Sequence, residues 1–249
     1  MNKYGLIGFP LGHSFSKRFF TEKFAREGIQ AVYDNYEIPD AKQLLDIVRE
    51  NPELRGLNCT IPHKQAIIPL LDSLSEEARE IGAVNVIRIR RQADGRPLLE
   101  GFNSDAIGFT NSIKPLLTPR HRKALVLGTG GASRAICYSL TKLGIAWTYV
   151  SRSGGEGMYR YEDITPEVMR NYEVVVNCSP IGMFPHTDAA PMLPYEAMDE
   201  RHLLYDLVYN PEETEFLKRG ARQGATVKGG LEMLHLQAIA SWDIWNEKL

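Results

Sequence analysis

The amino-acid sequence predicts an α/β protein with two domains, and three observations lead to this prediction. Short apolar runs alternate with helical patterns along the chain, as expected for strands covered by helices. The chain has 249 residues, near the length at which a single hydrophobic core stops growing. A glycine-rich turn at 128–131 opens a second, more regular series of strands and helices. We expect a first domain over 1–104, a second over 105–230, and a C-terminal helix at 231–249 that packs back on the first domain.

The composition narrows the class of partner. Apolar residues make up 43% of the chain and charged residues 24%, which is typical of a globular protein. The net charge of -2 leaves no basic surplus for nucleic acid or an anionic membrane, so we expect a small-molecule partner. The three cysteines are far apart and form no C-x-x-C pair, so neither a disulfide framework nor a metal site is indicated.

No apolar run approaches the ~20 residues of a membrane span, and the first apolar run is too short for a signal peptide. We therefore expect a soluble, cytoplasmic protein with no membrane partner. Either a monomer or a homodimer is compatible with the sequence.

The strands of the first domain are predicted from short apolar runs bounded by turn residues. They are expected at residues 4–8, 31–38, 57–60 and 84–89. Asp94-Gly95 is typical of a hairpin turn, so the last strand should return through residues 98–99.

The helices of this domain are predicted from periodic apolar positions and capping residues. Phe20 and Phe24 share one face of a helix that should end at Gly28. Asp40 is expected to cap a helix over 44–48, and Pro62 is expected in a first helical turn. A further capped helix is expected at 75–81.

The second domain has apolar runs that would be buried on both faces. These strands are expected at residues 123–127, 145–150, 173–177, 203–208 and 225–228. Helical stretches separate them, so a parallel sheet with helices on both faces is predicted. The stretch 151–157 is expected to be a loop, and the final helix should cover 231–245.

The sharpest local motif is a glycine loop between a strand and a helix. It consists of Gly128, Thr129, Gly130, Gly131 and Ala132, with Ser133 at the third position of the G-x-G-x-x-G spacing. Glycines here permit a tight turn and let a pyrophosphate approach the N–H groups at the helix start. An ordinary tight β-to-α turn is the alternative, but the second strand that follows favours a Rossmann-type dinucleotide domain.

The end of that second strand bears on the choice of cofactor. Ser151, Arg152 and Ser153 offer a cation between two hydroxyls and no carboxylate. An acidic residue here would bind a ribose 2′-hydroxyl, whereas arginine suits a 2′-phosphate, so NADP is the expected cofactor. A solvated surface arginine is the alternative.

Two hydroxyl residues stand close together after the first strand. Ser14 and Ser16 could both donate to one carboxylate beside a helix start, and helix capping is an equally reasonable role. His13 is expected to have a structural role in the loop.

Lys64 and Asp105 each follow a short apolar element within a polar cluster. They form a candidate acid/base pair if the fold brings them together. A solvent-exposed lysine and a helix-capping aspartate are the alternatives.

The order of these motifs resembles that of the shikimate dehydrogenase family, over nearly the whole chain. The motifs are G-x-P-x-x-H-S-x-S from Gly8, N-x-T-x-P-x-K ending at Lys64, GAVN at 82–85, NSD at 103–105, the glycine loop, NCSPIGM at 177–183, DLVYNP at 206–211, and residues 229–238.

This resemblance implies roles for individual residues. Lys64 and Asp105 would be the catalytic pair, and the substrate carboxylate would bind Ser14 and Ser16. The ring hydroxyls would bind Thr60, Lys64, Asn85, Asp105 and Gln237, with Tyr209 nearby. The nucleotide would lie on Gly128 to Ala132 with Arg152 and its neighbours at the 2′-phosphate, and Leu207 and Gly230 would lie near the nicotinamide.

The resemblance implies reversible, NADPH-dependent reduction of 3-dehydroshikimate to shikimate, without a metal. The stretch after Arg152 lacks the second basic residue often found in the family, so a moderate preference for NADP is expected. One alternative is an NAD-preferring quinate/shikimate dehydrogenase, against which the missing carboxylate at 151–153 argues. The other is a non-catalytic nucleotide-sensing module, which would have no need of both Lys64 and Asp105.

Overall fold

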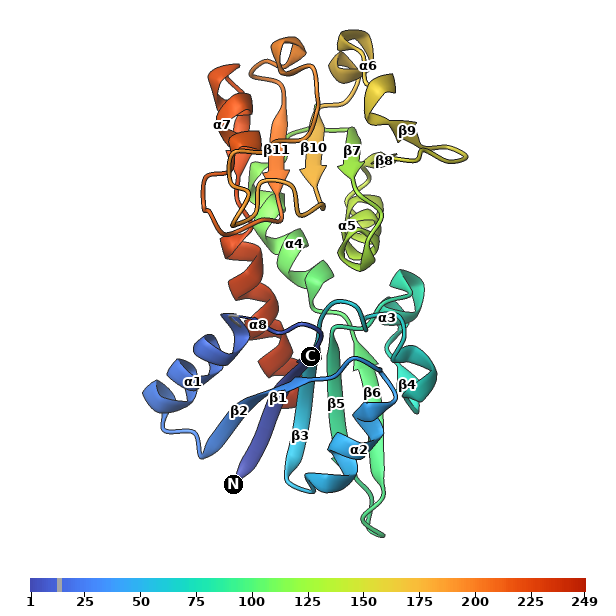
Figure 1. The fold of residues 1–249 in the computed structure, drawn as a ribbon, viewed down its shortest axis with the longest axis vertical. Helices are drawn as coiled ribbons and strands as arrows, with labels where there is room; N and C mark the ends of the chain where they lie inside the picture. Colours follow the sequence, from blue (N-terminus) through green and yellow to red (C-terminus); the bar gives the residue numbers. More distant parts are fainter. Residues whose placement is uncertain (13–14) are drawn as a thin grey trace. The chain divides into compact units, whose positions relative to one another are not determined.

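The computed structural model describes residues 1–12 and 15–249. The chain forms two compact units (Figure 1). One comprises Met1–Ser104 together with Ala238–Leu249, and the other comprises Asp105–Gln237. The first unit is therefore discontinuous in sequence, with the second unit inserted into it.

The first unit is built on a six-stranded mixed sheet. Its strands in spatial order are β2 (Ala31–Glu37), β1 (Asn2–Gly8), β3 (Leu54–Cys59), β5 (Val86–Arg91), β6 (Pro97–Phe102) and β4 (Ser73–Leu74). Strand β1 runs parallel to both neighbours, whereas β5 is antiparallel to β3 and to β6. The Asp94-Gly95 turn joins β5 to β6, so the predicted hairpin is confirmed.

Alternating side chains give this sheet two apolar faces. On one face Tyr4 packs with Phe20 and Phe24 of α1 (Phe15–Glu27), as the periodicity of that helix predicts. On the other face Ile7 packs with Leu44 of α2 (Gln43–Glu50). The 3₁₀ turn η1 (Ile68–Leu70) and helix α3 (Glu76–Ile81) complete the local structure.

The last residues of helix α8 (Leu231–Trp245) belong to the first unit. Trp245 is buried against Tyr4, with ring centres 4.9 Å apart, and its indole Nε1 donates to the Ile87 carbonyl oxygen (3.1 Å). Gly56 lies directly under the indole, where any Cβ atom would overlap the ring. A C-terminal tryptophan thus fills the core of the N-terminal sheet.

Two local predictions in this unit are wrong. Asp40 does not cap α2, because Lys42 occupies the N-cap position and the Asp40 carboxylate instead accepts the Lys42 N–H (2.9 Å). Pro62 does not begin a helix, because residues 61–67 form consecutive turns. The buried His63 ring contacts the Ile38 carbonyl oxygen (2.6 Å), and this long-range contact holds the segment in its non-helical path.

The second unit contains a six-stranded sheet in which all neighbours are parallel. The spatial order is β12 (Thr226–Lys228), β11 (Leu203–Asp206), β10 (Val174–Asn177), β7 (Lys123–Leu127), β8 (Ala146–Ser151) and β9 (Tyr159–Arg160). The predicted parallel sheet is confirmed.

Helices cover both faces of this sheet (Figure 1). One face packs against α4 (Asp105–Ile113), α5 (Gly131–Lys142) and the first part of α8. The other packs against α6 (Pro166–Arg170) and α7 (Glu215–Arg222). Three 3₁₀ turns lie at η2 (Lys114–Leu116), η3 (Tyr161–Asp163) and η4 (Tyr195–Ala197). Within the described ranges, no helix has the length and apolar composition to cross a membrane.

Candidate functional site

Several predicted substrate residues lie at one edge of the first unit's sheet. Thr60 follows β3, and its N–H donates to the Ile7 carbonyl oxygen at the end of β1 (3.0 Å). Asn85 precedes β5, and its carbonyl oxygen accepts the Cys59 N–H (2.8 Å). Because strand ends from separate parts of the chain meet here, the sheet brings Thr60 and Asn85 together.

Lys64 is attached to the same edge through its backbone. It is half-buried in the turns after Thr60, and its carbonyl oxygen accepts the Val84 N–H (2.7 Å), next to Asn85. Three residues predicted for ring hydroxyls therefore share one border of the sheet.

A buried polar network lies behind this edge. The Asn85 side chain binds both the Ser104 N–H (2.7 Å) and the Ser104 hydroxyl (3.0 Å). Ser104 in turn contacts the Ser241 hydroxyl of α8 (3.1 Å). Ser241 accepts from the Asn58 amide (2.9 Å), whose oxygen accepts from the Tyr33 hydroxyl (2.8 Å). The network fixes the amide orientation of Asn85, since both of its polar ends are bound.

The carboxylate-binding prediction falls on two serines, of which the structure describes one. Ser14 lies outside the described residues. Ser16 is half-buried in the first turn of α1 and shares a hydrogen bond with the Tyr33 phenol. Burial raises the pKa of Tyr33 far above its ordinary value, so this phenol stays neutral and connects Ser16 to the polar network.

The sequence did not reveal four members of this network, Tyr33, Asn58, Ser104 and Ser241, as a connected group. Their association depends on strand register and on the docking of α8, which a local pattern does not encode. The N-x-T spacing singled out Asn58 as part of a motif, but gave no indication of its partners.

In the second unit, Asp105 and Gln237 lie on two helices that pack closely. Asp105 is buried at the start of α4, and Gln237 is buried near the end of the α8 segment in this unit. One turn after Asp105, a Cβ atom on Gly108 would lie 3.1 Å from the Gln237 Cβ. The glycine therefore lets α8 approach α4 at the position of Gln237. Lys64 belongs to the first unit and Asp105 to the second, so their pairing remains a proposal.

The glycine loop joins β7 to α5 at the centre of the parallel sheet. Gly128 has a φ of +98°, in the left-handed region that favours glycine, and its N–H donates to the Val150 carbonyl oxygen (2.9 Å). At the third glycine position, the Ser133 hydroxyl donates to the Gly130 carbonyl oxygen (2.7 Å). Serine therefore fits there by binding the turn itself.

Gly130 provides a test of whether this loop suits a pyrophosphate. Apart from its chain neighbours, a Cβ atom there would meet no atom of the described residues within 4 Å, so local packing does not require glycine. Gly130 is the N-cap of α5, and it provides no side-chain cap for the first N–H groups of the helix. Open space over uncapped donors fits a bound phosphate group.

The residues predicted for the 2′-phosphate lie at the end of β8. Ser151 ends this strand, and its hydroxyl donates to the Gly154 carbonyl oxygen (3.3 Å). Arg152 and Ser153 are exposed in the loop that follows. Within residues 1–12 and 15–249, Arg152 forms no ion pair, so its charge is available to an anion.

Leu207 and Gly230 are brought together as a backbone contact. A Cβ atom on Gly230 would overlap the Leu207 carbonyl oxygen, and the Gly230 N–H donates to the Val208 carbonyl oxygen (3.2 Å). Tyr209 follows at the surface, with 37% of its area exposed.

A buried carboxylate supports this loop. Asp206 accepts from the Thr214 hydroxyl (2.6 Å), the Asn177 amide (2.9 Å) and the Val208 N–H (3.0 Å). Burial nevertheless raises the pKa of Asp206 to about 6, because desolvation outweighs the three hydrogen bonds. The DLVYNP motif thus contains a structural aspartate that holds the ends of β10 and β11.

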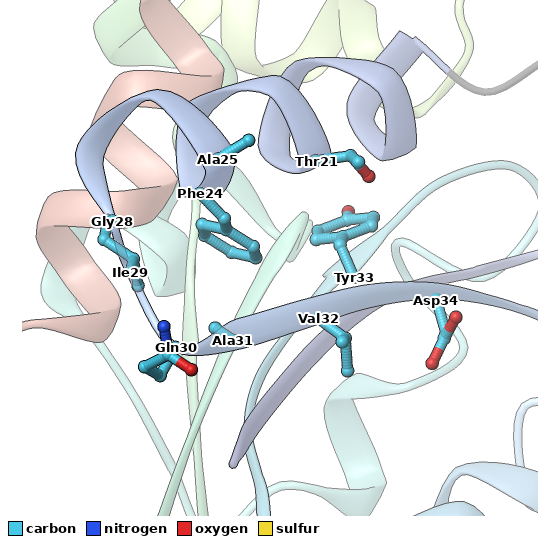
Figure 2. A pocket seen from close by; sticks show the side chains of 10 residues that line it. All are labelled: Thr21, Phe24, Ala25, Gly28, Ile29, Gln30, Ala31, Val32, Tyr33 and Asp34. Atoms are coloured by element: carbon cyan, nitrogen blue, oxygen red, sulfur yellow. The ribbon is translucent and has the colours of Figure 1, made fainter.

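A separate groove lies between α1 and β2 (Figure 2). Figure 2 shows Phe24 and Tyr33 between the helix and the strand. Among the described residues, none of those predicted for the site lines this groove, whose wall combines apolar side chains such as Phe24 and Ile29 with polar ones such as Gln30 and Asp34. In the part of the chain that is described, no cluster of three His, Cys, Asp or Glu side chains could hold a metal ion.

The fold and these sites define a dinucleotide-binding α/β protein with a second, ligand-binding unit. The order β9-β8-β7-β10-β11-β12, with a glycine loop after β7, is that of the doubly wound dinucleotide fold. The chain belongs to the shikimate dehydrogenase family. Residues 6–87 match the family description "Shikimate dehydrogenase substrate binding domain".

Known proteins of this family match nearly the whole chain. The shikimate dehydrogenase (NADP(+)) of Methanosphaera stadtmanae is 32% identical over 98% of this chain and 91% of its own length. A crystal structure of shikimate 5-dehydrogenase from Thermus thermophilus, in complex with NADP(H) and shikimate, has a TM-score of 0.84 at 32% identity. That match covers 99% of this chain and 94% of the other. A Listeria monocytogenes shikimate 5-dehydrogenase, in complex with shikimate and NAD, has a TM-score of 0.85 at 27% identity and covers 99% of this chain and 92% of the other.

Proposed function

We propose that this protein is an NADP-dependent shikimate dehydrogenase, an oxidoreductase that reversibly reduces 3-dehydroshikimate to shikimate. The observation that carries the proposal is the convergence of Thr60, Lys64 and Asn85 on one edge of the first sheet. These residues come from separate segments and match the positions that contact substrate in the family pattern. The similarity to NADP(+) enzymes over nearly the full chain supports the same reaction and cofactor.

The substrate is proposed to bind through its carboxylate and its ring hydroxyls. Ser14 and Ser16 would donate to the carboxylate beside the start of α1. The ring hydroxyls would bind a set of polar residues from both units, with Tyr209 nearby: Thr60, Lys64, Asn85, Asp105 and Gln237. The polar network behind Asn85 supports this role, because a fixed amide loses little freedom when it binds a hydroxyl.

The cofactor is proposed to lie along the carboxyl ends of the parallel strands. Gly128, Thr129, Gly130, Gly131 and Ala132 would hold its pyrophosphate, and the segment Ser151, Arg152 and Ser153 would hold the 2′-phosphate. Leu207 and Gly230 would contact the nicotinamide. When bound, NADPH supplies the hydride that reduces the ketone.

The protein's own chemical contribution is proposed to be proton transfer. Lys64 would donate a proton to the carbonyl oxygen of 3-dehydroshikimate as negative charge develops there. Asp105 would bind the neighbouring hydroxyl and stabilise the Lys64 ammonium. In the oxidative direction the same pair would remove the hydroxyl proton.

The test is a spectrophotometric assay of NADP⁺ and NAD⁺ reduction with shikimate and with quinate. NADP⁺ reduction with shikimate is the expected result. Lys64→Ala should then lower kcat by about 10²- to 10⁴-fold, with a smaller effect on KM. An enzyme that favours NAD⁺ with quinate would replace the proposal by the quinate/shikimate alternative. If neither substrate is oxidised, a nucleotide-sensing role takes its place.

We also propose a cytoplasmic location. Within the described part of the chain, Cys59, Cys137 and Cys178 form no disulfide, which suits a reducing compartment.

A further inference from the structure

An unusually short connection joins β8 to β9, the two strands at one edge of the parallel sheet. Strand β8 ends at Ser151 and β9 begins at Tyr159, so only residues 152–158 lie between them (Figure 1). Parallel strands are ordinarily joined by a dozen or more residues. The short path suffices here because the strands pair over two positions alone, Val150 with Tyr159 and Ser151 with Arg160.

This pairing brings Arg160 beside the residues expected at the 2′-phosphate. The Cα atoms of Ser151 and Arg160 are register partners, and side chains at paired positions of parallel strands project from the same face. Arg152 is the next residue after Ser151. Two arginines separated by eight positions in sequence therefore lie at the same strand end.

The stem of Arg160 is packed against the loop backbone. Its Cγ and Nε atoms lie 2.9 and 3.1 Å from the point where a Cβ atom on Gly154 would be. Gly154 has a φ of +66°, and its carbonyl oxygen accepts the Ser151 hydroxyl (3.3 Å). Because Gly154 has no side chain, the Arg160 stem can pack directly against this loop.

The charges around Arg160 leave it able to bind an anion. Its guanidinium pairs with Glu162 (3.3 Å), but both side chains are largely exposed, so the pair contributes little. The Asp163 carboxylate is bound by the Arg160 backbone N–H (2.8 Å). Glu156 is exposed in the loop itself and adds a negative charge to this region.

We propose that Arg160 is a second cationic residue of the 2′-phosphate site and determines, with Arg152, the preference for NADP over NAD. The inference rests on the proposed function, which identifies this strand end as the adenosine end of the cofactor. From the sequence we expected no second cation in this site, because none follows Arg152 in the loop. The proposal assigns this role to Arg160 of the adjacent strand β9. The preference for NADP should accordingly be that of a site with two arginines.

The first experiment measures dissociation constants of the full-length protein for NADP⁺, NAD⁺ and adenosine 2′-monophosphate. Arg160→Ala should weaken binding of NADP⁺ and adenosine 2′-monophosphate by about 10- to 100-fold and leave NAD⁺ within about twofold. Arg152→Ala should act in the same direction, and the double variant should bind NADP⁺ no better than NAD⁺. Arg222→Ala, an exposed arginine of α7, is the matched control and should change neither.

A second variant tests the charge balance in the opposite direction. Glu162→Gln removes the carboxylate that competes for Arg160, so NADP⁺ should bind about two- to fivefold tighter. Arg160→Lys should restore part of the affinity lost in Arg160→Ala, because lysine keeps the charge but loses bidentate binding.

The result that overturns the inference is an Arg160→Ala variant with a wild-type ratio of NADP⁺ to NAD⁺ affinity. A wild-type protein that binds NADP⁺ no tighter than NAD⁺ also overturns it. Failure of the proposed function is a separate outcome, since it would appear as absent shikimate oxidation while the binding measurements still report on Arg160.

Discussion

Asp206 makes a specific prediction about stability and pH. The carboxyl is fully buried, and its pKa is raised from 3.8 to about 6 by desolvation. A group that holds its proton more tightly in the folded state stabilises the fold when protonated, so its contribution is lost as pH rises through about 6. The stability of the second unit should therefore fall over this range because of Asp206.

The change to make is Asp206→Asn, which is neutral at every pH and has the same shape. Its oxygen can still accept from the Asn177 amide and the Val208 N–H, and its amide can donate to the Thr214 hydroxyl oxygen. In the wild type, the pKa of Asp206 is raised by about two units, so the free energy of unfolding falls by about 3 kcal/mol once this carboxyl is fully ionised. The unfolding free energy of the wild type depends on the protonation of Asp206, whereas that of the variant does not. Between pH 4.5 and pH 7, the difference between the two unfolding free energies should therefore change by about 2 kcal/mol, in favour of the variant.

The assay is urea unfolding at several pH values, followed by circular dichroism. Amide hydrogen exchange of β10 and β11 assigns the transition to the second unit. Asp188→Asn, a change at an exposed aspartate, is the control and should show no such dependence. If the difference in unfolding free energy between Asp206→Asn and wild type stays constant from pH 4.5 to pH 7, the reasoning is refuted, because burial would then not raise the pKa of this carboxyl.

Four further predictions concern the substrate, the nucleotide, the backbone of the glycine loop and the core. The double variant Ser14→Ala/Ser16→Ala should weaken substrate binding by at least about 1.5 to 3 kcal/mol in calorimetry, since hydrogen bonds to a charged group are lost, and unchanged affinity would leave both serines as capping residues. Gly130→Ala should keep the melting temperature of the wild type, because the added Cβ meets open space, yet weaken NADPH binding measured by fluorescence. Gly128→Ala should additionally cost about 1 to 2 kcal/mol of stability because of its left-handed backbone, and equal stability of the two variants would contradict this. Trp245→Ala should destabilise the first unit by about 3 to 5 kcal/mol in urea unfolding, and a loss below about 1 kcal/mol would show that the indole is not a core element.

The elements that sequence reasoning found best are those with strong local signals. The strand Lys123–Leu127 and the helix Leu231–Trp245 have the predicted bounds, because each is an apolar segment with clear punctuation at both ends. Gly28 ends its helix with a positive φ of 63°, as a helix-stop glycine should.

The elements that were missed are very short strands. The two-residue strands Ser73–Leu74 and Tyr159–Arg160 exist only because Glu100-Gly101 and Val150-Ser151 lie beside them. No periodicity can develop over two residues. Between Ser153 and Arg160 the sequence has only glycines, a glutamate, a methionine and a tyrosine. This stretch gave no indication that Arg160 lies beside the end of β8.

The residues of the candidate site also divide into those that a local pattern predicted and those that it did not. Motif spacing singled out Thr60 and Asn85, which stand next to strand ends, and Lys64, which lies in the turns that follow Thr60. The hydrogen bond between Asn58 and Ser241 joins a residue before the inserted unit in the sequence to one after it. A local motif cannot predict such a pairing.

The insertion of one unit into the other sets an order of events during synthesis. As the chain leaves the ribosome from its N-terminus, the first sheet emerges without Ser241 and Trp245, which complete its network and its core. Asp105–Gln237 is by then a continuous stretch with its own sheet and both of its helical layers. We therefore expect the nucleotide-binding unit to fold first, and the substrate-binding unit, although its first part is translated earlier, to become stable only after residues 238–249 have emerged.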